Sequence, residues 1–395
     1  MTDRLLAGIR EWLFDEGRQA PTNMILFDQL CHRLTAEGLP LWRAVVQFGT
    51  LHPLYQAHSL FWWRDTGIEH VQRSHEFMSS PEFHASTYKH ILDRGGMLRV
   101  RLTGMADLKF KLLSDLKEQG GTDFLMTLMP VSEGISPGLS WTTDRREGFS
   151  TAEIELLRAL PRYLGPLMEV RSLKLTMTTL LDTYLGRGPA HQVLSGAVRR
   201  GELRRVSAVV VLTDLHEFTA KAESWEESEL LGALDGYLEI VVDAVSANGG
   251  EVLKFMGDGV LAIFAVTDER PVNRCCDAAL RALMAARQAL AQLNGERLRA
   301  GKDALEFGSA LHVGDLAYGN VGGRERLDFT VIGSAVNLAS RLLRLCKVLD
   351  APILATEEIA RHSVTPMNEI GARRLRGAAR PVRVFAPIGA GRFGG

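Results

Sequence analysis

Two aspartates in the C-terminal half of the 395-residue sequence have the positions expected of metal ligands. Asp214 directly follows the apolar run VSAVVVLT, and Asp258 lies in a Gly-Asp-Gly turn between two strand-like segments. Side chains at strand ends and in tight turns can converge on a ligand without belonging to the core. Because Mg²⁺ binds a few carboxylates together with phosphate oxygens, the pair suits metal-assisted chemistry on a phosphate. Turn aspartates are common, so neither residue alone predicts a site.

A lysine and a helix supply groups that could hold an organic phosphate. Lys254 lies within an otherwise apolar strand, where its amine must reach water or an acceptor. In the segment GSAVNLASRLLRLCK, Gly333 and Ser334 begin a helix on which Asn337 and Arg341, four residues apart, share one face. An amide and a guanidinium placed in this way could hold a ribose and a phosphate. Each residue taken singly is also compatible with a solvated surface.

The elements that must position these side chains alternate between strands and helices. The run at 206–213 is apolar on both faces, which is typical of a covered strand. We expect a helix at about 225–247 and a longer one that begins at Pro271 and ends at Gly295. Further strand-like segments lie at 251–255, 260–266, 305–313, 327–332, 352–355 and 381–386. The alternation predicts an α/β fold for this half.

The N-terminal half mixes helices and strands. An amphipathic helix is expected over residues 1 to about 30. Ser150 and Glu153 form a capping box that begins a helix carrying apolar Ile154 and Leu157. Strand-like segments lie at 41–48, 97–102, 123–131 and 138–143.

The segment 166–200 is predicted to be a helical signalling linker. Its apolar residues form a helical stripe at positions 173, 177, 180, 181 and 184. The stripe stops at the breaker cluster GRGP (186–189), and a second short helix over 190–203 leads to the next domain. The stripe fits a two-helix coupler in a dimer or a helix packed on its own domain. The domain that follows favours the coupler.

Composition limits the classes of partner. The chain is 46% hydrophobic and 24% charged with a net charge of −1, which gives no electrostatic case for nucleic acid or an anionic membrane. The four cysteines show no CxxC pair, as expected for a reducing cytosol. Acidic residues interrupt the apolar pattern at the N-terminus, which is unlike a signal peptide, and no apolar run approaches 18 residues. We therefore expect a cytoplasmic protein.

Three motifs in a fixed order resemble the catalytic domain of class III adenylate/guanylate cyclases. They are TDLHEFT at 213–219, KFMGDGVLAIF at 254–264 and DFTVIGSAVNLASR at 328–341. The resemblance covers roughly 204–388, about half of the chain, without gaps in the motifs. It implies a ferredoxin-like, palm-type α+β domain with a central mixed sheet at 201–388, acting as an adenylate cyclase on ATP.

The resemblance assigns roles to the residues of the first two motifs. It implies that Asp214 and Asp258 bind two Mg²⁺ or Mn²⁺ ions per active site, with the Leu215 carbonyl as a further ligand. It places the triphosphate against the backbone of Phe218 and Thr219.

The remaining roles concern the base, the ribose and the α-phosphate. Lys254 matches the lysine that reads adenine, and Thr330 falls at its partner position, as in the subgroup called class IIIb, some members of which respond to bicarbonate. Asn337 would orient the ribose, and Arg341 would stabilise charge on the α-phosphate. The implied reaction is attack of the ribose 3′-oxygen on the α-phosphorus, with pyrophosphate leaving. Because each site takes groups from two protomers, the resemblance implies a homodimer.

The sequence departs from the family pattern at two positions. The residue before Phe218 is usually Gly in the family but is Glu217 here, which is strained if the turn needs a positive φ. A family lysine that contacts the triphosphate is replaced by Arg376, which keeps the charge but not the geometry. Both changes concern rate more than reaction class.

The stretch from about 24 to 165 resembles a GAF-type sensor domain, chiefly through the segment GLSWTTDRREGFSTAEIELLRAL. We therefore expect a regulatory domain at 1–165 that takes an unknown small-molecule or protein signal. Seven histidines lie between 32 and 90, but their spacing fits no standard metal or haem site. Trp62 and Trp63 could line a ligand pocket but are expected in the core or a dimer contact, and Cys275 and Cys276 are expected to be packing residues.

Three alternatives remain at this point. A guanylate cyclase usually has Glu and a small residue such as Cys at the two base-reading positions, so Lys254 with Thr330 argues against it. A diguanylate cyclase would carry a GGDEF signature, which is absent. A catalytically weak nucleotide-sensing module is supported only by Glu217.

Overall fold

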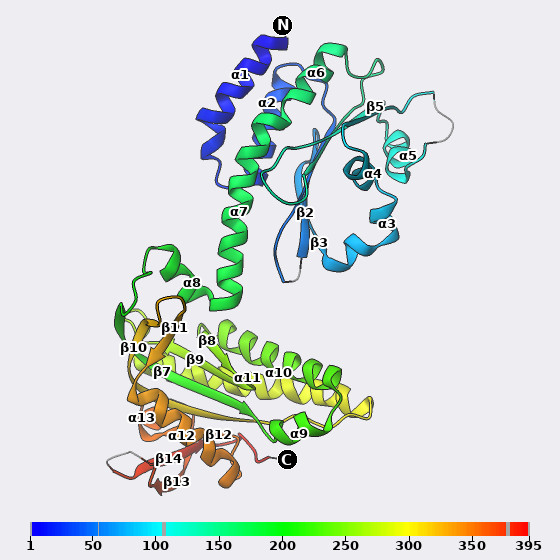
Figure 1. Cartoon of the computed structure of the whole chain (residues 1–395). Helices are drawn as coiled ribbons and strands as arrows, with labels where there is room; N and C mark the ends of the chain where they lie inside the picture. Colours follow the sequence, from blue (N-terminus) through cyan, green and yellow to red (C-terminus); the bar gives the residue numbers. More distant parts are fainter. Residues whose placement is uncertain (1, 54, 105–107, 377–379, 394–395) are drawn as a thin grey trace. The chain divides into compact units, whose positions relative to one another are not determined.

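The structure of the chain, a computed structural model, describes residues 2–53, 55–104, 108–376 and 380–393 (Figure 1). It divides into two compact units, one up to Leu180 and one from Leu181 on. The boundary falls within the segment 166–200 that the sequence predicts as a linker. In the described part of the chain, no helix combines the length and apolarity that crossing a membrane requires.

The N-terminal unit is built on a six-stranded antiparallel sheet in the order β3-β2-β1-β6-β5-β4. Its strands are β1 (Arg43–Gly49), β2 (Tyr55–Trp63), β3 (Gly67–Ser74), β4 (Met97–Arg101), β5 (Asp123–Leu128) and β6 (Gly138–Thr143). The sequence predicts β1, β4, β5 and β6 but misses the β2–β3 hairpin. That hairpin ends the sheet, and polar residues interrupt its apolar pattern.

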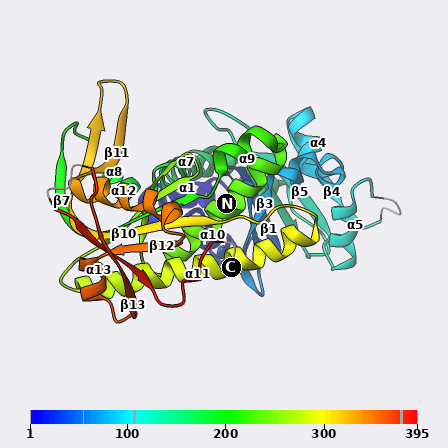
Figure 2. The same ribbon diagram turned by 90° about the horizontal axis from the view of Figure 1, so that it is seen from below.

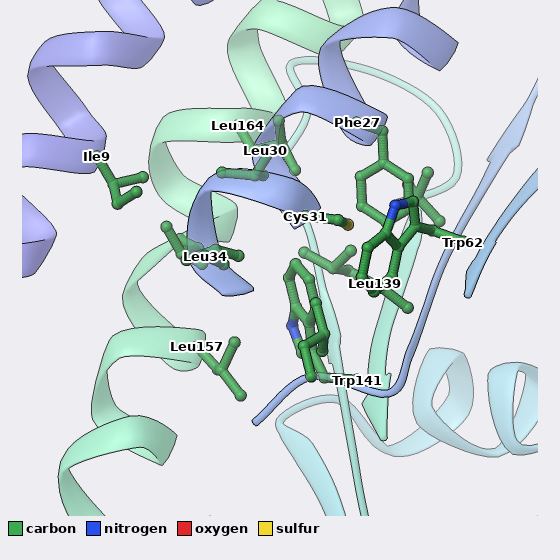
Figure 3. Close-up of a cluster of buried hydrophobic side chains, with 14 of the residues drawn as sticks. Ile9, Phe27, Leu30, Cys31, Leu34, Trp62, Leu139, Trp141, Leu157 and Leu164 are labelled. Carbon is green, nitrogen blue, oxygen red and sulfur yellow. The ribbon is translucent and has the colours of Figure 1, made fainter. Parts of the chain in front are cut away.

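Helices cover both faces of this sheet. They are α1 (Thr2–Asp15), α2 (Asn23–Ala36), α3 (Pro81–His84), α4 (Thr87–Arg94), α5 (Lys111–Glu118), α6 (Thr151–Ala159) and α7 (Pro161–Leu185), with short 3-10 turns η1 (Gly17–Gln19) and η2 (His75–Ser79). One core joins α1, α2, α6 and α7 to one sheet face around Trp62 and Trp141 (Figure 3). A second core joins α4 and α5 to the other face. The expected single N-terminal helix is two helices, separated by η1 and Pro21.

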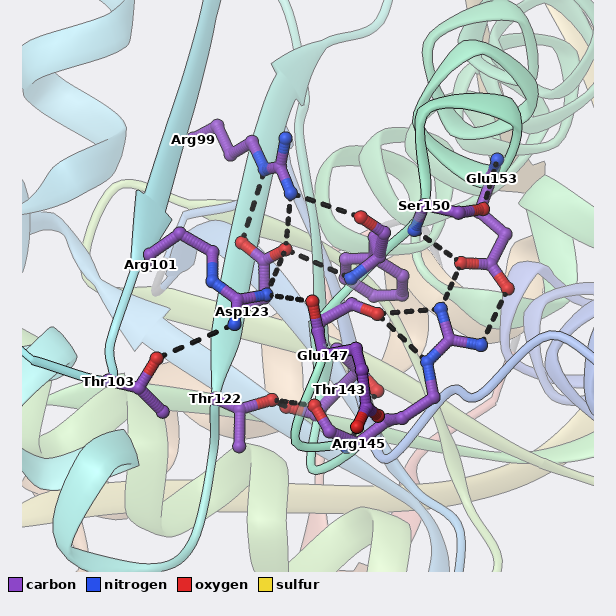
Figure 4. Close-up of polar contacts among 12 residues, drawn as sticks. Arg99, Arg101, Thr103, Thr122, Asp123, Thr143, Arg145, Glu147, Ser150 and Glu153 are labelled. Atoms are coloured by element: carbon purple, nitrogen blue, oxygen red, sulfur yellow. Dashed lines mark hydrogen bonds and ion pairs between the residues drawn. The ribbon is translucent and has the colours of Figure 1, made fainter.

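A polar cluster fixes the loop between β6 and α6. Asp123 is fully buried and accepts from Arg99 Nη2 at 2.8 Å, Arg101 Nη1 at 3.4 Å and the Phe149 N–H at 3.0 Å (Figure 4). The predicted capping box of α6 is confirmed, and Arg145 pairs with its Glu153. Every charge in this cluster is therefore met by the chain itself.

The C-terminal unit is built on a mixed sheet in the order β13-β14-β12-β10-β7-β9-β8, with β11 paired to β10. Its strands are β7 (Leu203–Leu215), β8 (Glu251–Met256), β9 (Gly259–Ala265), β10 (Phe307–Gly322), β11 (Leu327–Ile332), β12 (Ile353–Thr356), β13 (Met367–Arg373) and β14 (Val382–Pro387). Only β10 and β12 pair in parallel among the described strands. The predicted mixed sheet is confirmed.

The helices of this unit cover both sheet faces, as the apolar run of β7 predicts. They are α8 (Arg187–Leu194), α9 (Phe218–Ser224), α10 (Glu227–Ala247), α11 (Val272–Arg299), α12 (Ser334–Val348) and α13 (Glu357–His362). Helices α10 and α11 lie side by side against Val209 and Val211 of β7 (Figures 1 and 2). Helix α12 packs on the other face, against Val210 and Leu212.

Two helix boundaries differ from the predictions. Helix α11 runs through Gly295 to Arg299, because one glycine costs only about 1 kcal/mol and Asn294 anchors this turn to Leu305. Helix α8 ends at Leu194 rather than near residue 203. Cys275 and Cys276 are buried in the core of α11, which confirms them as packing residues.

Candidate active site

The two predicted metal ligands come together at the end of β7. Asp214 is the next-to-last residue of the strand, and Asp258 lies in the two-residue turn that joins β8 to β9, the neighbouring strand. The turn is possible because Gly257 has φ +69. A hydrogen bond of 2.6 Å between the hydroxyls of Thr213 and Tyr237 ties the strand end to α10. The sheet therefore holds both carboxylates in place.

The two carboxylates interact directly. Desolvation, the negative charge of Asp258 and a hydrogen bond to Asp258 raise the pKa of Asp214 to about 7. A raised pKa of this kind means that, without a cation, Asp214 keeps its proton below about pH 7. A divalent cation would relieve the same repulsion without a proton.

The carboxylates open onto a pocket of about 680 Å³. The start of α9, the β8–β9 turn and one side of α12 line it, and α12 contributes Arg344 and Lys347. Sequence reasoning missed both cations. Ser340, Arg344 and Lys347 follow the i, i+4, i+7 spacing of one helical face, and this pattern could have indicated them.

The residues present fit a magnesium or manganese site. No group of three or more His, Cys, Asp or Glu side chains able to hold a metal occurs in the described ranges. The chain would therefore contribute the two carboxylates and the Leu215 carbonyl. Phosphate oxygens and water would complete the coordination, which is the usual way in which Mg²⁺ is bound beside a substrate. The same finding gives no support to a metal site among the described histidines.

The turn that leads into α9 carries backbone strain. Glu217 has φ 59 and ψ 23, the left-handed region in which a residue with a Cβ is disfavoured. The sequence predicted strain here if the turn needs a positive φ, and the structure confirms it. Phe218 and Thr219 follow as the first residues of α9, and both line the pocket.

Lys254 forms an ion pair that the sequence did not indicate. Its Nζ atom lies 2.6 Å from Oδ2 of Asp328 on β11. Thr330, the predicted partner, is two residues further along the same strand, so it shares a face with Asp328, and it is buried. Residues two apart on a strand lie on the same face, and this pattern could have indicated Asp328 from the position of Thr330.

The remaining predicted residues lie outside the pocket of their own chain. Asn337 and Arg341 are on α12, but the described lining of the pocket includes neither of them, nor Lys254 or Thr330. Arg376 follows β13 and is exposed, and it is also outside this lining. One chain thus brings together the two carboxylates but not the residues predicted to read the base and to hold the ribose and α-phosphate.

Part of the chain is similar in sequence to known proteins. It is 35% identical over 161 residues to an adenylate cyclase of Anabaena cylindrica, covering 40% of this chain and 31% of that protein. It is 26% identical over 189 residues to adenylate cyclase 1 of Rhizobium meliloti (strain 1021), covering 47% of this chain and 28% of that protein. The chain thus spans about a third of the length of these relatives. No protein-family model matches it.

A solved structure shares the fold. The structure of a bacterial light-regulated adenylyl cyclase matches with a TM-score of 0.50 and 20% identity, covering 71% of this chain and 89% of that one. The mixed sheet, the ordered motifs and the sequence relatives agree. These relatives support the class III adenylyl/guanylyl cyclase family for the part of the chain that they match.

Proposed function

We propose that the protein is an adenylate cyclase that converts ATP to 3′,5′-cyclic AMP and pyrophosphate. The observation that carries this proposal is the pocket at the end of β7, which is lined by two carboxylates and by Arg344 and Lys347. Such a pocket suits a polyphosphate that arrives with divalent cations, because the cations of α12 match its charge and the carboxylates match the metal. Attack of the ribose 3′-oxygen on the α-phosphorus then needs mainly positioning and charge neutralisation.

Asp214, Asp258 and the Leu215 carbonyl would hold two Mg²⁺ or Mn²⁺ ions. When bound, such ions neutralise phosphate charge and activate a hydroxyl group. The backbone at Phe218 and Thr219 would lie against the triphosphate. Arg376 is exposed and could reach a substrate only from outside this pocket.

The groups that surround Lys254 can read the adenine of ATP. An ammonium can donate to N1 of adenine, and a carboxylate or hydroxyl beside it can accept from the amino group. Asp328 lies 2.6 Å from Lys254, and Thr330 shares its strand face, so either can serve as the acceptor. A guanylate cyclase is the second candidate, since a Lys–Asp pair can also satisfy the O6 and N1–H of guanine.

We further propose a homodimer with two equivalent sites. Asn337 and Arg341 lie outside their own pocket, so a second copy is needed to bring them to a substrate. Helix α7 also carries a seam of apolar residues with the 3-4 spacing of a coiled coil: Val170, Leu173, Met177, Leu180 and Tyr184. Four of them are exposed in the single chain, and Leu180 is half-buried.

Regulation by the N-terminal unit is part of the proposal. Helix α7 begins in that unit at Pro161 and continues without a break to Leu185, past Leu181, where the C-terminal unit begins. A pair of such helices would carry a change from one unit to the other. The competing sensing-module function is supported by the strain at Glu217.

The first experiment measures cyclic nucleotide formation by the purified chain with ATP or GTP and with Mg²⁺ or Mn²⁺. We expect cyclic AMP from the wild type and none from Asp258→Ala. Binding of ATP without any product would favour the sensing module. Cyclic GMP as the main product would show that the substrate is GTP and not ATP.

A mixing experiment tests the shared site. Asp258→Ala and Arg341→Ala are each expected to be inactive, but mixed dimers retain one intact site. Random exchange should restore about a quarter of wild-type activity, because half of the dimers are mixed and each has one good site of two. No recovery, with exchange verified by differently tagged chains, would contradict a site shared between protomers.

A further inference from the structure

Two arginines are almost fully buried in the described part of the chain, and they differ in their hydrogen-bond acceptors. Arg297 donates to the Asp303 carbonyl at 2.8 Å and pairs with Glu229 at 3.4 Å. Arg43 is only 5% exposed, yet within the described residues its side chain makes no hydrogen bond or ion pair. A buried cation without an acceptor is costly, so this exception calls for an explanation.

Arg43 begins β1 in the middle of the N-terminal sheet. Ala44 and Val46 belong to the core on one face, so Arg43 points to the opposite face. Its Cζ atom lies 5.0 Å from the ring centre of Trp63 and 5.4 Å from that of Phe61. The two rings stabilise the charge through their faces but accept no N–H hydrogen bond from the edge of the guanidinium.

A second polar group beside Arg43 is also without a partner. Thr142 of β6 is directly opposite Arg43 in the strand pairing, so the two side chains lie on the same face. Thr142 is fully buried, and neither its hydroxyl nor the Nε atom of Arg43 has a hydrogen-bond partner. Burial lowers the pKa of Arg43 to about 10, with no carboxylate to oppose the effect.

Most other arginines of this unit with described side-chain contacts have acceptors. Arg33 is the exception, since its Nε atom also has no partner, but its side chain is only half-buried. Arg99 and Arg101 share Asp123, and Arg64 forms a two-pronged pair with Asp144. Arg171 has no carboxylate, but it donates to the backbone carbonyls of η1 and its surroundings. Several buried polar atoms of this unit have no partner, but Arg43 and Thr142 differ from the others in lying directly opposite each other, so that one outside group could complete both.

We propose that Arg43 and Thr142 form a binding site for a small carboxylate in the N-terminal unit. The guanidinium donates two parallel N–H groups to the carboxylate, as Arg does in bidentate pairs, and the threonine hydroxyl donates to the same group. Phe61 and Trp63 flank the site, which favours a carboxylate with a short apolar body. The inference does not depend on the cyclase reaction of the other unit.

The test follows thermal unfolding of the full chain by tryptophan fluorescence. Five of the six tryptophans, at 12, 42, 62, 63 and 141, lie in the N-terminal unit, so the signal reports that unit. Acetate and benzoate are compared with acetamide and benzamide, which have the same shapes without the charge, at equal ionic strength. We expect the carboxylates to raise the Tm by a few degrees at about 100 times their Kd and the amides to leave it unchanged.

Arg43→Met and a matched control, Arg171→Met, complete the test. In carboxylate-free buffer Arg43→Met should melt at or above the wild-type temperature, because it removes an unpaired charge, and it should lose the response to acetate. Arg171→Met should melt lower and keep that response, since its donors already have partners. Equal stabilisation by acetate and acetamide would overturn the proposal even if a variant fails to fold. So would an acetate response that survives in Arg43→Met, or an Arg43→Met that is as unstable as Arg171→Met.

Discussion

Asp123 in the N-terminal unit and Asp214 in the C-terminal unit are both carried by strands of central sheets, and the chain meets their charges in opposite ways. Asp123 is surrounded by two arginines and a backbone N–H. Asp214 faces Asp258, another acid, and its pKa rises to about 7. A carboxylate whose hydrogen-bond donors all come from the chain itself stabilises the fold. A carboxylate that lies beside another carboxylate is available for a ligand.

The largest effect on activity should come from substitution of Asp214 or Asp258. Replacing Asp214 or Asp258 with Asn should lower cyclase activity by at least about 100-fold, because it removes a carboxylate from the proposed metal site. The same change removes repulsion, so the Tm without metal should stay equal or rise. Activity assays with Mn²⁺ and thermal melts in EDTA measure the two effects. A large fall in metal-free stability would show that the pair is structural.

Asp123 should behave in the reverse way. Asp123→Ala leaves the buried Phe149 N–H without its acceptor and removes the carboxylate from Arg99 and Arg101, which keep only uncharged acceptors. We expect a loss of about 3 kcal/mol in the free energy of unfolding of the N-terminal unit. Denaturant unfolding followed by tryptophan fluorescence measures it. Asp144→Asn breaks the partly exposed pair with Arg64 and is the control, with an expected loss below about 1 kcal/mol. Equal losses would remove the distinction between buried and exposed pairs.

The cations opposite the acids should affect substrate binding. Arg344→Gln and Lys347→Gln should each raise the KM for ATP by about 10-fold, with a smaller change in kcat, because charged contacts to the triphosphate exist before and during the reaction. Lys302→Gln, an exposed cation beyond the end of α11, is the control and should change neither constant. A wild-type KM in the double variant would assign the two cations to the surface rather than to the site.

The sequence predicted the acids but not their surroundings, and the reason is physical. Asp214 and Asp258 are fixed by local signals, a strand end and a glycine turn. Asp328 meets Lys254 across 74 positions of the chain, and that contact depends on how β8 and β11 lie in the folded sheet. Local patterns set what a residue can do, and tertiary packing decides which partner it finds.

The same division appears in the fold. Strands with long apolar runs, such as β7 and β5, were predictable because an uninterrupted apolar run indicates burial on both faces. The β2–β3 hairpin was not, since it mixes histidine and other polar residues with aromatic ones. Capping of α6 by Ser150 was predictable because the whole interaction lies within four residues.

The raised pKa of Asp214 predicts a dependence on pH. The unfolded chain has the ordinary pKa of 3.8 and the folded chain about 7, so the folded state holds the extra proton between these values. Without metal, this group makes the protein less stable as pH rises from about 4 through 7. A cation competes with the proton, so the Tm increase caused by Mn²⁺ should be larger at pH 8 than at pH 5.5. Asp258→Asn should reduce the difference, because it removes two of the causes of the raised pKa but leaves the desolvation. An equal Mn²⁺ effect at both pH values in the wild type would contradict the prediction.

The smallest effect should come from Glu217, where strain and charge can be separated. Glu217→Gly relieves the left-handed backbone and should stabilise the C-terminal unit by about 0.5 kcal/mol, since the strain relieved exceeds the extra freedom of glycine in the unfolded chain. It also removes a negative charge beside the pocket, so the KM for ATP should fall about twofold. Glu217→Gln removes the charge but keeps the strain, and it should lower the KM without raising the Tm. If the two variants have the same Tm, the strain is negligible; if neither lowers the KM, Glu217 does not face the triphosphate, and the acids that matter there are Asp214 and Asp258 alone.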